Sequence, residues 1–380
     1  MLGNRKLILD TFCEVYDLLL PWMDGDFFDF SKHHVVPGAV YLIGRAQMNH
    51  NREYIRELIE KGVIHVVLSN PAEGSETLKH HCEYVHKCGD LMRDRRMLLI
   101  GGGDMDSDWP CLQYESFLPK ILDYDENLLA MTHTDQIFQK VDKPYKFLFL
   151  NGRSRSHRKY LLEHFGMSGL LDQAIWTNLE DRPGLSRDIS LWHQDQDLMT
   201  VSRDIKLLPP RYEVDRYRQR VDQCFDTKFV KYDLFKHEWG EIYIEPAPYV
   251  DTYFSMVTET VFNYPYSFRT EKIWKPIAMA HPWIAAANYG YYRDLHNLGF
   301  KSFGHLIDET FDQIENSQDR IARIAQVTED LCRQDLAQFL NACYNICKYN
   351  QQHLIDMCSK IRNEFPERFF MFIKEKFLWS

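Results

Sequence analysis

The stretch that decides the fold of this chain is Phe268-Arg-Thr-Glu-Lys-Ile-Trp-Lys-Pro-Ile-Ala-Met-Ala-His-Pro-Trp-Ile-Ala-Ala-Ala287. Its order of polar and apolar residues predicts a loop, a short helix and then a buried strand. Thr270 is expected to cap the helix, because its hydroxyl can accept a backbone N–H that lacks a partner inside the helix. Glu271 and Lys272 then fall in the first turn, where a phosphate gains from the helix dipole and the lysine charge. A capped surface helix is the alternative.

A second segment, residues 145–165, reads as strand, polar loop and helix. Residues 147–150 are apolar and long enough for a buried strand, and apolar residues return at helical spacing after the loop. The basic residues between them are Arg153, Arg155, His157, Arg158 and Lys159. Nucleotides bind at such turns along the carboxyl edge of a parallel sheet, and the arginine fork matches phosphate oxygens. A solvated basic loop is the alternative.

These two segments resemble the donor-binding region of fucosyltransferase-like glycosyltransferases, a resemblance that covers about the second half of the chain. The family carries an aromatic-x-Thr-Glu-Lys-Leu/Ile motif before a helix and a strand, and Phe268 stands where the family usually has Tyr. The resemblance implies that Glu271 holds the donor ribose and that Lys272 meets the diphosphate. It also implies a diphosphate contact for Arg158, which best matches the family's arginine at the helix start. Arg153 and Arg155 are additional cations of the donor site.

Glu259 is a further candidate for donor binding, because it follows the apolar run 254–257. The resembling family has a Glu-Asn or similar pair here, whereas this chain has Glu259-Thr260. The carboxylate can bond a sugar or ribose hydroxyl, or it can face solvent at the strand end. Ser267 stands eight positions later, so the two-glutamate pattern of many retaining GT-B enzymes is missing, which favours an inverting enzyme.

Strand and helix patterns alternate along the chain and predict parallel βαβ units. Strands are expected at residues 7–9, 40–43, 63–68 and 97–100, with a helix from about 75 to 88. A second series is expected at 147–150, 242–244, 255–257, 282–286 and 302–303. Residues 178–238 are polar and read as an insertion of loops and short helices.

The expected fold class is therefore α/β, with two Rossmann-like domains in the GT-B layout that the resemblance implies, and C-terminal helices. The expected domains are an acceptor domain at 1–142, a nucleotide-sugar domain at 143–312 and terminal helices at 313–380. Chemistry is expected in the cleft between the two domains.

An inverting transfer needs a base that takes the proton of the acceptor hydroxyl. Asp104 and Asp106, which follow the glycines 101–103, and Glu73 are the candidates, and the sequence does not choose among them. Each can instead be a turn residue, since Asp favours turns. The glycines lack the Gly-x-Gly-x-x-Gly spacing of a dinucleotide site and suit a close backbone approach or a tight turn.

Composition sets outer limits on the function. The net charge of −10 disfavours a surface that coats nucleic acid, although a local basic groove remains compatible with it. Nine scattered cysteines indicate reduced thiols in the cytoplasm of the producing or host cell. No apolar run is long enough for a membrane span, and the N-terminus lacks a signal-peptide core. His80, His81, Cys82, His86 and Cys88 match no common zinc spacing, so no metal site is expected.

The sequence thus predicts a glycosyltransferase that moves a sugar from a nucleotide-diphospho-sugar to a hydroxyl, with no cofactor besides that donor substrate. The chain is also similar to uncharacterised phage and giant-virus glycosyltransferase-like proteins, so the acceptor stays open between a glycan, a protein and a modified base in viral DNA. The alternatives are a catalytically silent nucleotide-binding or assembly module of the same fold, and another nucleotide enzyme such as a sugar-nucleotide epimerase or a dehydrogenase.

Overall fold

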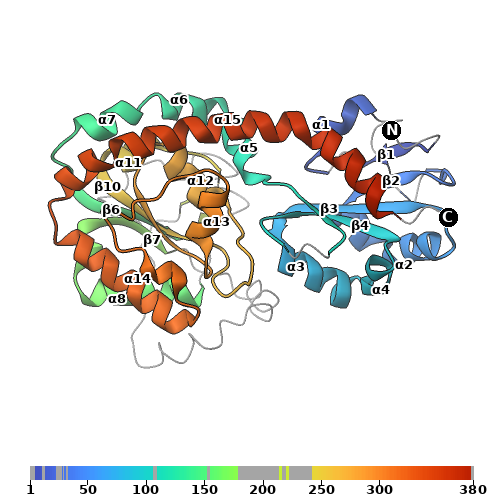
Figure 1. The fold of residues 1–380 in the computed structure, drawn as a ribbon, viewed down its shortest axis with the longest axis horizontal. Coiled ribbons are helices and arrows are strands. Elements are labelled where there is room, and N and C mark those ends of the chain that lie inside the picture. The colour runs from blue at the N-terminus through green and yellow to red at the C-terminus, as the bar shows by residue number, and fades with distance from the viewer. Residues whose placement is uncertain are drawn as a thin grey trace. The chain divides into compact units, whose positions relative to one another are not determined.

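The computed structural model describes residues 5–10, 13–22, 28, 30, 33–105, 109–151, 155–178, 214–215, 220–221 and 242–377. The chain divides into two compact units (Figure 1). The first unit comprises Met1–Ser116 and Met357–Ser380, and the second comprises Phe117–Asp356. This division falls at residue 116 instead of the expected 142, since helices α5 (Phe117–Leu122), α6 (Asp125–Met131) and α7 (Thr134–Gln139) belong to the second unit.

The first unit contains a five-stranded parallel sheet whose strands lie in chain order. The strands are β1 (Leu7–Leu9), β2 (Val40–Gly44), β3 (His65–Gly74), β4 (Met97–Gly102) and β5 (Cys111–Gln113). The first four confirm the expected strands, whereas β5 has only three residues and too little pattern to be predicted. Helices α2 (Arg45–Glu60), α3 (Ser75–His80) and α4 (Gly89–Arg93) lie between the strands along the chain.

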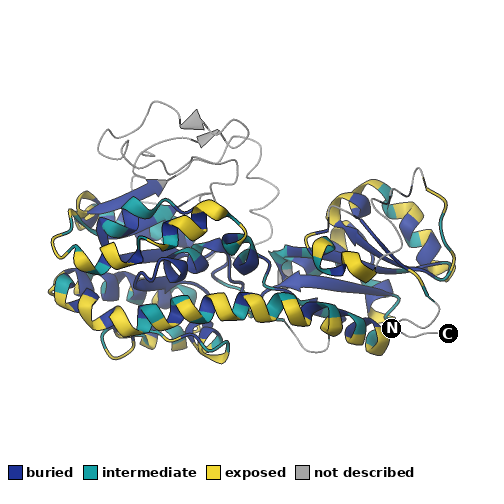
Figure 2. Ribbon diagram, turned by 90° about the horizontal axis from the view of Figure 1, so that it is seen from above, coloured by how far each residue is buried: buried dark blue, intermediate teal, exposed yellow. Residues whose placement is uncertain are grey.

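Two hydrophobic cores cover the two faces of this sheet. Alternate strand residues such as Tyr41 and Ile43 pack with α2, α3 and α4, because successive side chains of a strand point to opposite faces. The residues between them, such as Val40 and Leu42, pack with Phe369 and other aromatic residues of α15 (Leu336–Lys376). Figure 2 shows the strands buried and the helices exposed along their outer sides. The C-terminal part of α15 therefore covers one face of a sheet that the N-terminal part of the chain forms.

The second unit contains a four-stranded parallel sheet in the order β11-β10-β6-β7. Its strands are β6 (Tyr145–Asn151), β7 (Ala174–Asn178), β10 (Thr252–Thr258) and β11 (Trp283–Ala286). The helices of this unit include α8 (Ser156–Met167), α12 (Glu271–Ala278), α13 (Tyr291–Asn297) and α14 (Ser317–Cys332). The α/β class and the two Rossmann-like units expected from the sequence are confirmed.

Two expected strands of the second unit are wrong. Residues 242–244 form no strand, because the buried Asn127 amide takes their backbone bonds: its Nδ2 donates to Ile242 O at 3.1 Å, and Ile244 N donates to its Oδ1 at 2.8 Å. Residues 302–303 form a loop, in which Phe303 N donates to Glu309 Oε1 at 2.8 Å.

Some other expectations are only partly matched. The helix expected at 75–88 is divided, since α3 is followed by a π-helical turn at His81–Val85. Most of the expected insertion at 178–238 lies outside the described residues.

The strand order of the second sheet defines a switch point. From β6 the chain continues to β7 on one side, and it later returns to β10 on the other side of β6. Ligands in open α/β sheets bind at the carboxyl ends of the strands where the order reverses in this way. The carboxyl ends of β6 and β10 are therefore the place to look for a site.

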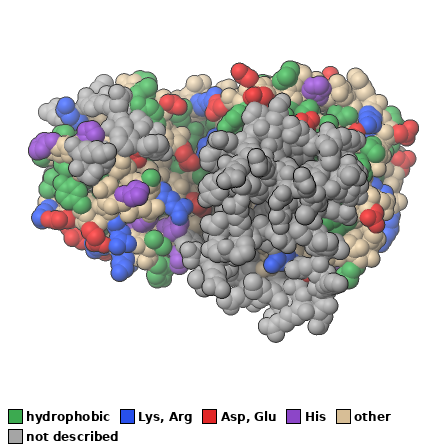
Figure 3. All heavy atoms as spheres, turned by 180° about the vertical axis from the view of Figure 1, so that it is seen from behind, with side chains coloured by type: hydrophobic (Ala, Val, Ile, Leu, Met, Phe, Trp, Pro, Cys, Tyr) green, Lys and Arg blue, Asp and Glu red, His purple; other side chains and the backbone are tan. Residues whose placement is uncertain are grey.

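Two surface properties bear on partners. Among the helices that the structure describes, none is long and apolar enough to cross a membrane. Acidic and basic side chains are interspersed on the described surface that Figure 3 presents. The described part of that face shows no broad field of one sign that would attract a polyanion.

Candidate functional site

A polar bridge joins the two strands at the switch point. Thr258 Oγ1, at the end of β10, donates to Asn151 Oδ1, at the end of β6, over 2.7 Å. The Asn151 side chain is 2% exposed, and its Nδ2 has no hydrogen-bond partner among the described residues. A buried amide without a partner is uncommon in a folded protein, so this donor marks the edge as a place for a polar ligand.

Glu259, directly after β10, connects several segments of the site through its carboxylate. Its fully buried carboxylate accepts from Thr270 N at 3.1 Å, Thr270 Oγ1 at 2.6 Å, Tyr291 Oη at 2.8 Å and Thr260 N at 3.3 Å. These four donors replace the water that a buried carboxylate loses. The carboxylate thereby ties the start of α12 and the start of α13 to the end of β10.

The start of α12 is formed as the sequence predicts. Thr270 is the N-cap residue, with an extended backbone, and its Oγ1 accepts from Lys272 N at 3.4 Å. Ile273, Trp274 and Ile277 bury one face of the helix. Glu271 and Lys272 therefore lie in the first turn, at the end of the helix where backbone N–H groups favour an anion.

The Lys272 Nζ lies close to three oxygen atoms at the start of α12. It lies 2.5 Å from Glu271 Oε1, 3.2 Å from Thr270 Oγ1 and 3.3 Å from Thr260 Oγ1, and the Lys272 side chain is 22% exposed. Burial acts to raise the pKa of Glu271, but the charges of Lys272 and Lys275 outweigh it and lower that pKa. Glu271 is thus ionised at neutral pH, and the Lys272 Nζ beside it is partly open to solvent.

The basic segment after β6 divides into buried and half-buried parts. Arg158 is 4% exposed, and its Nη2 donates to Thr258 O and Glu259 O, each at 3.1 Å. His157 lies beside it, with Nε2 at 2.9 Å from Glu259 O. Arg155 precedes α8 as its N-cap residue, is half-buried, and its Nε has no partner among the described residues. Arg153 lies outside the described residues.

The structure thus brings most of the predicted donor-site residues together. Arg158 and Lys272 bond to consecutive residues at the end of β10, and Glu259 and Thr270 bond to each other. Arg155 begins the helix that carries Arg158. Their contacts with a nucleotide stay a prediction.

Sequence reasoning missed two polar groups of this edge. Tyr291 supplies a donor to Glu259, and buried Asn288, after β11, leaves its Oδ1 without a partner among the described residues. Asn288 Nδ2 donates to Ser267 Oγ at 3.1 Å. Asn288 could have been found from the sequence, because it is a polar residue that follows an apolar strand. No local pattern in the sequence indicates a role for Tyr291.

Two of the three candidate bases, Glu73 and Asp104, lie at the carboxyl edge of the first sheet. The register between β3 and β4 shifts between Asn70 and Gly74, and this irregularity brings Glu73 next to the end of β4, where Asp104 follows. Glu73 Oε1 lies 3.2 Å from Arg45 Nη1, and Asp104 Oδ1 lies 3.4 Å from Gln113 Nε2. Asp106 lies outside the described residues.

The glycines before Asp104 serve packing and a turn. A Cβ on Gly101 would lie 3.1 Å from Cys111 Sγ and 3.2 Å from Leu78 Cδ2. Gly103 has φ of +72°, a backbone conformation that other residues seldom adopt. Of the two expectations for these glycines, the structure shows the tight turn.

No protein-family model and no curated protein matches the chain. Among solved structures, the chain is similar to a UDP-forming alpha,alpha-trehalose-phosphate synthase from Burkholderia xenovorans, with 12% sequence identity and a TM-score of 0.39. The similarity covers 89% of this chain and 74% of that chain. A likeness at this score carries no argument about this chain, and the site is defined by its own geometry.

Proposed function

We propose that this protein is a glycosyltransferase whose donor is a nucleotide-diphospho-sugar. One observation supports this most: Arg158, Lys272 and the start of α12 gather at the switch point of the second sheet, beside Arg155. A diphosphate is the ligand that such a group suits, because charge-assisted bonds and a helix N-terminus both favour phosphate oxygens. The resemblance of the Thr270–Lys272 motif to fucosyltransferase-like enzymes supports the sugar-transfer assignment.

The proposed reaction is a single displacement with inversion. The acceptor oxygen forms a bond to the anomeric carbon, while the bond from that carbon to the diphosphate oxygen breaks. The electron pair leaves with the nucleoside diphosphate, whose growing negative charge Lys272 and Arg155 stabilise. The acceptor proton passes to a carboxylate, for which Glu73 and Asp104 are the described candidates and Asp106 remains a third.

The two glutamates of the second unit have different proposed roles. Glu271 holds the donor ribose, as the resemblance implies. Glu259 acts as a positioning residue, because its four bonds are already made within the protein and they fix the segment that carries Thr270. The acceptor is a hydroxyl compound, either a glycan, a protein or a modified base.

Ligand binding and turnover test the proposal together. Nucleoside diphosphates and nucleotide sugars are screened by thermal shift, where a ligand at 100 times its dissociation constant adds about 2.7 kcal/mol of stability. Release of nucleoside diphosphate from a nucleotide sugar is then measured with and without hydroxyl acceptors. Binding together with release supports a glycosyltransferase.

The other outcomes identify the alternatives. Binding without release indicates a silent module of the same fold, and interconversion of nucleotide sugars indicates an epimerase. If no nucleotide stabilises the protein, the proposed donor site is wrong.

A further inference from the structure

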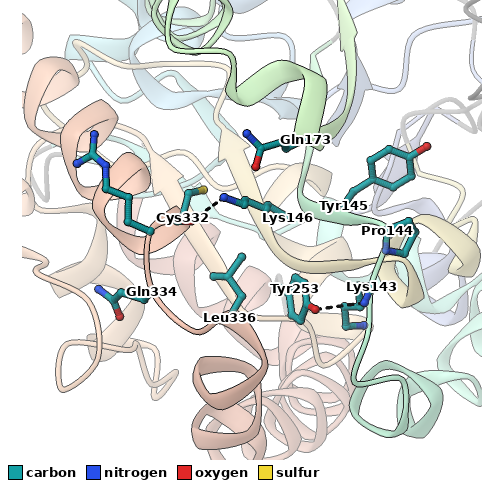
Figure 4. A pocket seen from close by; sticks show the side chains of 10 residues that line it. Lys143, Pro144, Tyr145, Lys146, Gln173, Tyr253, Cys332, Gln334 and Leu336 are labelled. Carbon is teal, nitrogen blue, oxygen red and sulfur yellow. Dashed lines mark hydrogen bonds between the residues drawn. The ribbon is translucent and has the colours of Figure 1, made fainter.

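A polar pocket lies at the amino edge of the second unit's sheet, opposite the carboxyl edge that carries the proposed nucleotide site. It has a volume of about 610 Å³, within the range of small-ligand sites. Figure 4 shows the residues that line it, which come from the starts of β6 and β10, from the residue before β7 and from the turn between α14 and α15. They are Lys143, Pro144, Tyr145, Lys146, Gln173, Tyr253, Cys332, Arg333, Gln334 and Leu336.

The charge of this lining is one-sided. It contains Lys143, Lys146 and Arg333, and none of the ten lining residues is acidic. Arg333 forms ion pairs with Glu329 and Asp330 on α14, so two carboxylates offset its charge within the protein. Neither Lys143 nor Lys146 forms an ion pair among the described residues, so no carboxylate bonds to either of these two lining lysines.

Each lysine is held by one backbone carbonyl. Lys143 Nζ donates to Val250 O at 2.6 Å, and Lys146 Nζ donates to Cys332 O at 2.8 Å. An ammonium has three N–H donors, so donors remain for a ligand at each position. The Tyr253 hydroxyl accepts from Lys143 N at 3.2 Å and fixes the segment that carries Lys143 (Figure 4).

The surroundings of Lys143 disfavour its charge. Burial, followed by the nearby Lys140 ammonium, lowers the pKa of Lys143 to about 7. Asp251 acts in the opposite direction, but it is itself paired with Lys140. His281 is buried with a pKa lowered to about 3, chiefly by burial, and is neutral at physiological pH. A bound anion would supply the missing counter-charge.

We propose that this pocket binds a small dianion of the phosphate or sulfate class, between Lys143 and Lys146. The site is distinct from the proposed nucleotide site, because β6 and β10 begin beside the pocket and end at the switch point. At about 3.3 Å per residue, their seven residues separate the two places by roughly 20 Å. One phosphate group cannot contact both.

The proposal predicts a pH dependence with a defined sign. The dianion binds the charged form of Lys143, whose pKa in the free protein is about 7, so affinity rises as the pH falls through 7. Sulfate is the suitable probe because its own charge does not change in this range. Lys143→Arg should keep the binding and remove the pH dependence, since arginine stays charged. A lysine with a merely structural role would not produce this pattern.

Calorimetric titration of the full chain with sulfate tests the proposal. Lys143→Gln and Lys146→Gln should each weaken binding about tenfold, the usual scale of one charge-assisted bond. Lys301→Gln is the matched control, because it removes a lysine of the same unit that does not line the pocket. Thermal unfolding of each variant confirms that it is folded.

Lys272→Ala separates this site from the proposed nucleotide site. Sulfate binding that is unchanged in Lys272→Ala and weakened about tenfold in each of the two pocket variants supports the proposal. Loss in Lys272→Ala alone, or no saturable binding at all, overturns it. Inorganic phosphate, a sugar phosphate and a nucleoside diphosphate are then compared on Lys272→Ala, to show which source of the dianion the pocket prefers.

Discussion

The carboxyl edges of the two sheets carry different kinds of carboxylate. Glu259, in the second unit, is fully buried and accepts from four donors. Glu73, in the first unit, has a side chain that is 36% exposed and forms an ion pair with Arg45. The first edge presents acids to solvent, whereas the second uses its acid to hold a helix start in place.

Strand order explains this difference. The first sheet runs β1 to β5 in sequence, so no strand order reverses among its described strands. The second sheet reverses between β6 and β10, and buried polar groups such as Asn151 and Glu259 lie at the carboxyl ends of these two strands. Buried polar groups must be satisfied by one another or by a ligand. The comparison therefore agrees with the proposal that the second unit binds the donor and that the first unit supplies the base.

The strongest test of this comparison concerns the candidate bases. Either Glu73→Gln or Asp104→Asn should lower kcat by about 10²- to 10⁴-fold, the usual contribution of a general base. Neither should change the dissociation constant for a nucleoside diphosphate. Steady-state kinetics and calorimetry check the two halves of this expectation. Weaker nucleotide binding in either variant would contradict the division of roles, and unchanged kcat in both would leave Asp106 as the candidate.

The next test compares the stability that each carboxylate supplies. Glu259→Ala should lower the free energy of unfolding by about 3–5 kcal/mol. The substitution leaves several buried donors without an acceptor, and each such donor costs about 1–3 kcal/mol. Glu73→Ala should change it by less than about 1 kcal/mol, as an exposed ion pair does. Differential scanning calorimetry can resolve units that unfold separately. Equal effects of the two variants would break the comparison, and Glu259→Gln, which retains one acceptor oxygen, should fall between them.

A smaller effect is expected for the cation of the second edge. Lys272→Ala should weaken nucleoside diphosphate binding about tenfold and leave nucleoside binding unchanged, because the lost charge pairs with phosphate. Its thermal midpoint should stay close to that of the parent protein, since Lys272 Nζ is partly open to solvent. Arg158→Lys should instead lower both affinity and stability, because Arg158 is buried and bonded to two carbonyls. Equal losses for the nucleoside and its diphosphate would remove Lys272 from the phosphate site.

The smallest expected effect is that of a chelator. If Lys272 and the neighbouring arginines stabilise the leaving diphosphate, transfer should continue at an unchanged rate in excess chelator. Activity is measured before and after chelation, and again after addition of magnesium or manganese. Loss that a metal restores would move the protein to a metal-dependent class.

Local features of this molecule were readable from the sequence. The cap at Thr270 depends on its own hydroxyl and on an N–H two residues away, so the motif alone predicted it. The buried strands β1, β2, β4 and β6 followed from short apolar runs between polar segments. The proposed chemistry of the donor site also follows from residue types, since arginine and lysine beside a helix start suit phosphate.

Features that depend on distant partners were not readable. Residues 242–244 have the composition of a strand, but an amide 115 residues away in the sequence takes the backbone bond of Ile242. The β7 strand stayed hidden because Ile175 and Trp176 provide only a brief apolar signal. The sequence placed Glu259 at a strand end, but it did not show that Tyr291, 32 residues later, would bind its carboxylate.

The sequence by itself thus determined most of the buried strands, the start of α12, and which charges stand beside them, because those properties depend on neighbours a few residues away. Only the tertiary structure decided the order of the strands. That order placed the switch point between β6 and β10, buried Arg158 and Glu259 there, and placed Lys143 and Lys146 in the lining of one pocket at the opposite edge. Burial and strand order depend on contacts between residues far apart in the chain, and no local pattern encodes them.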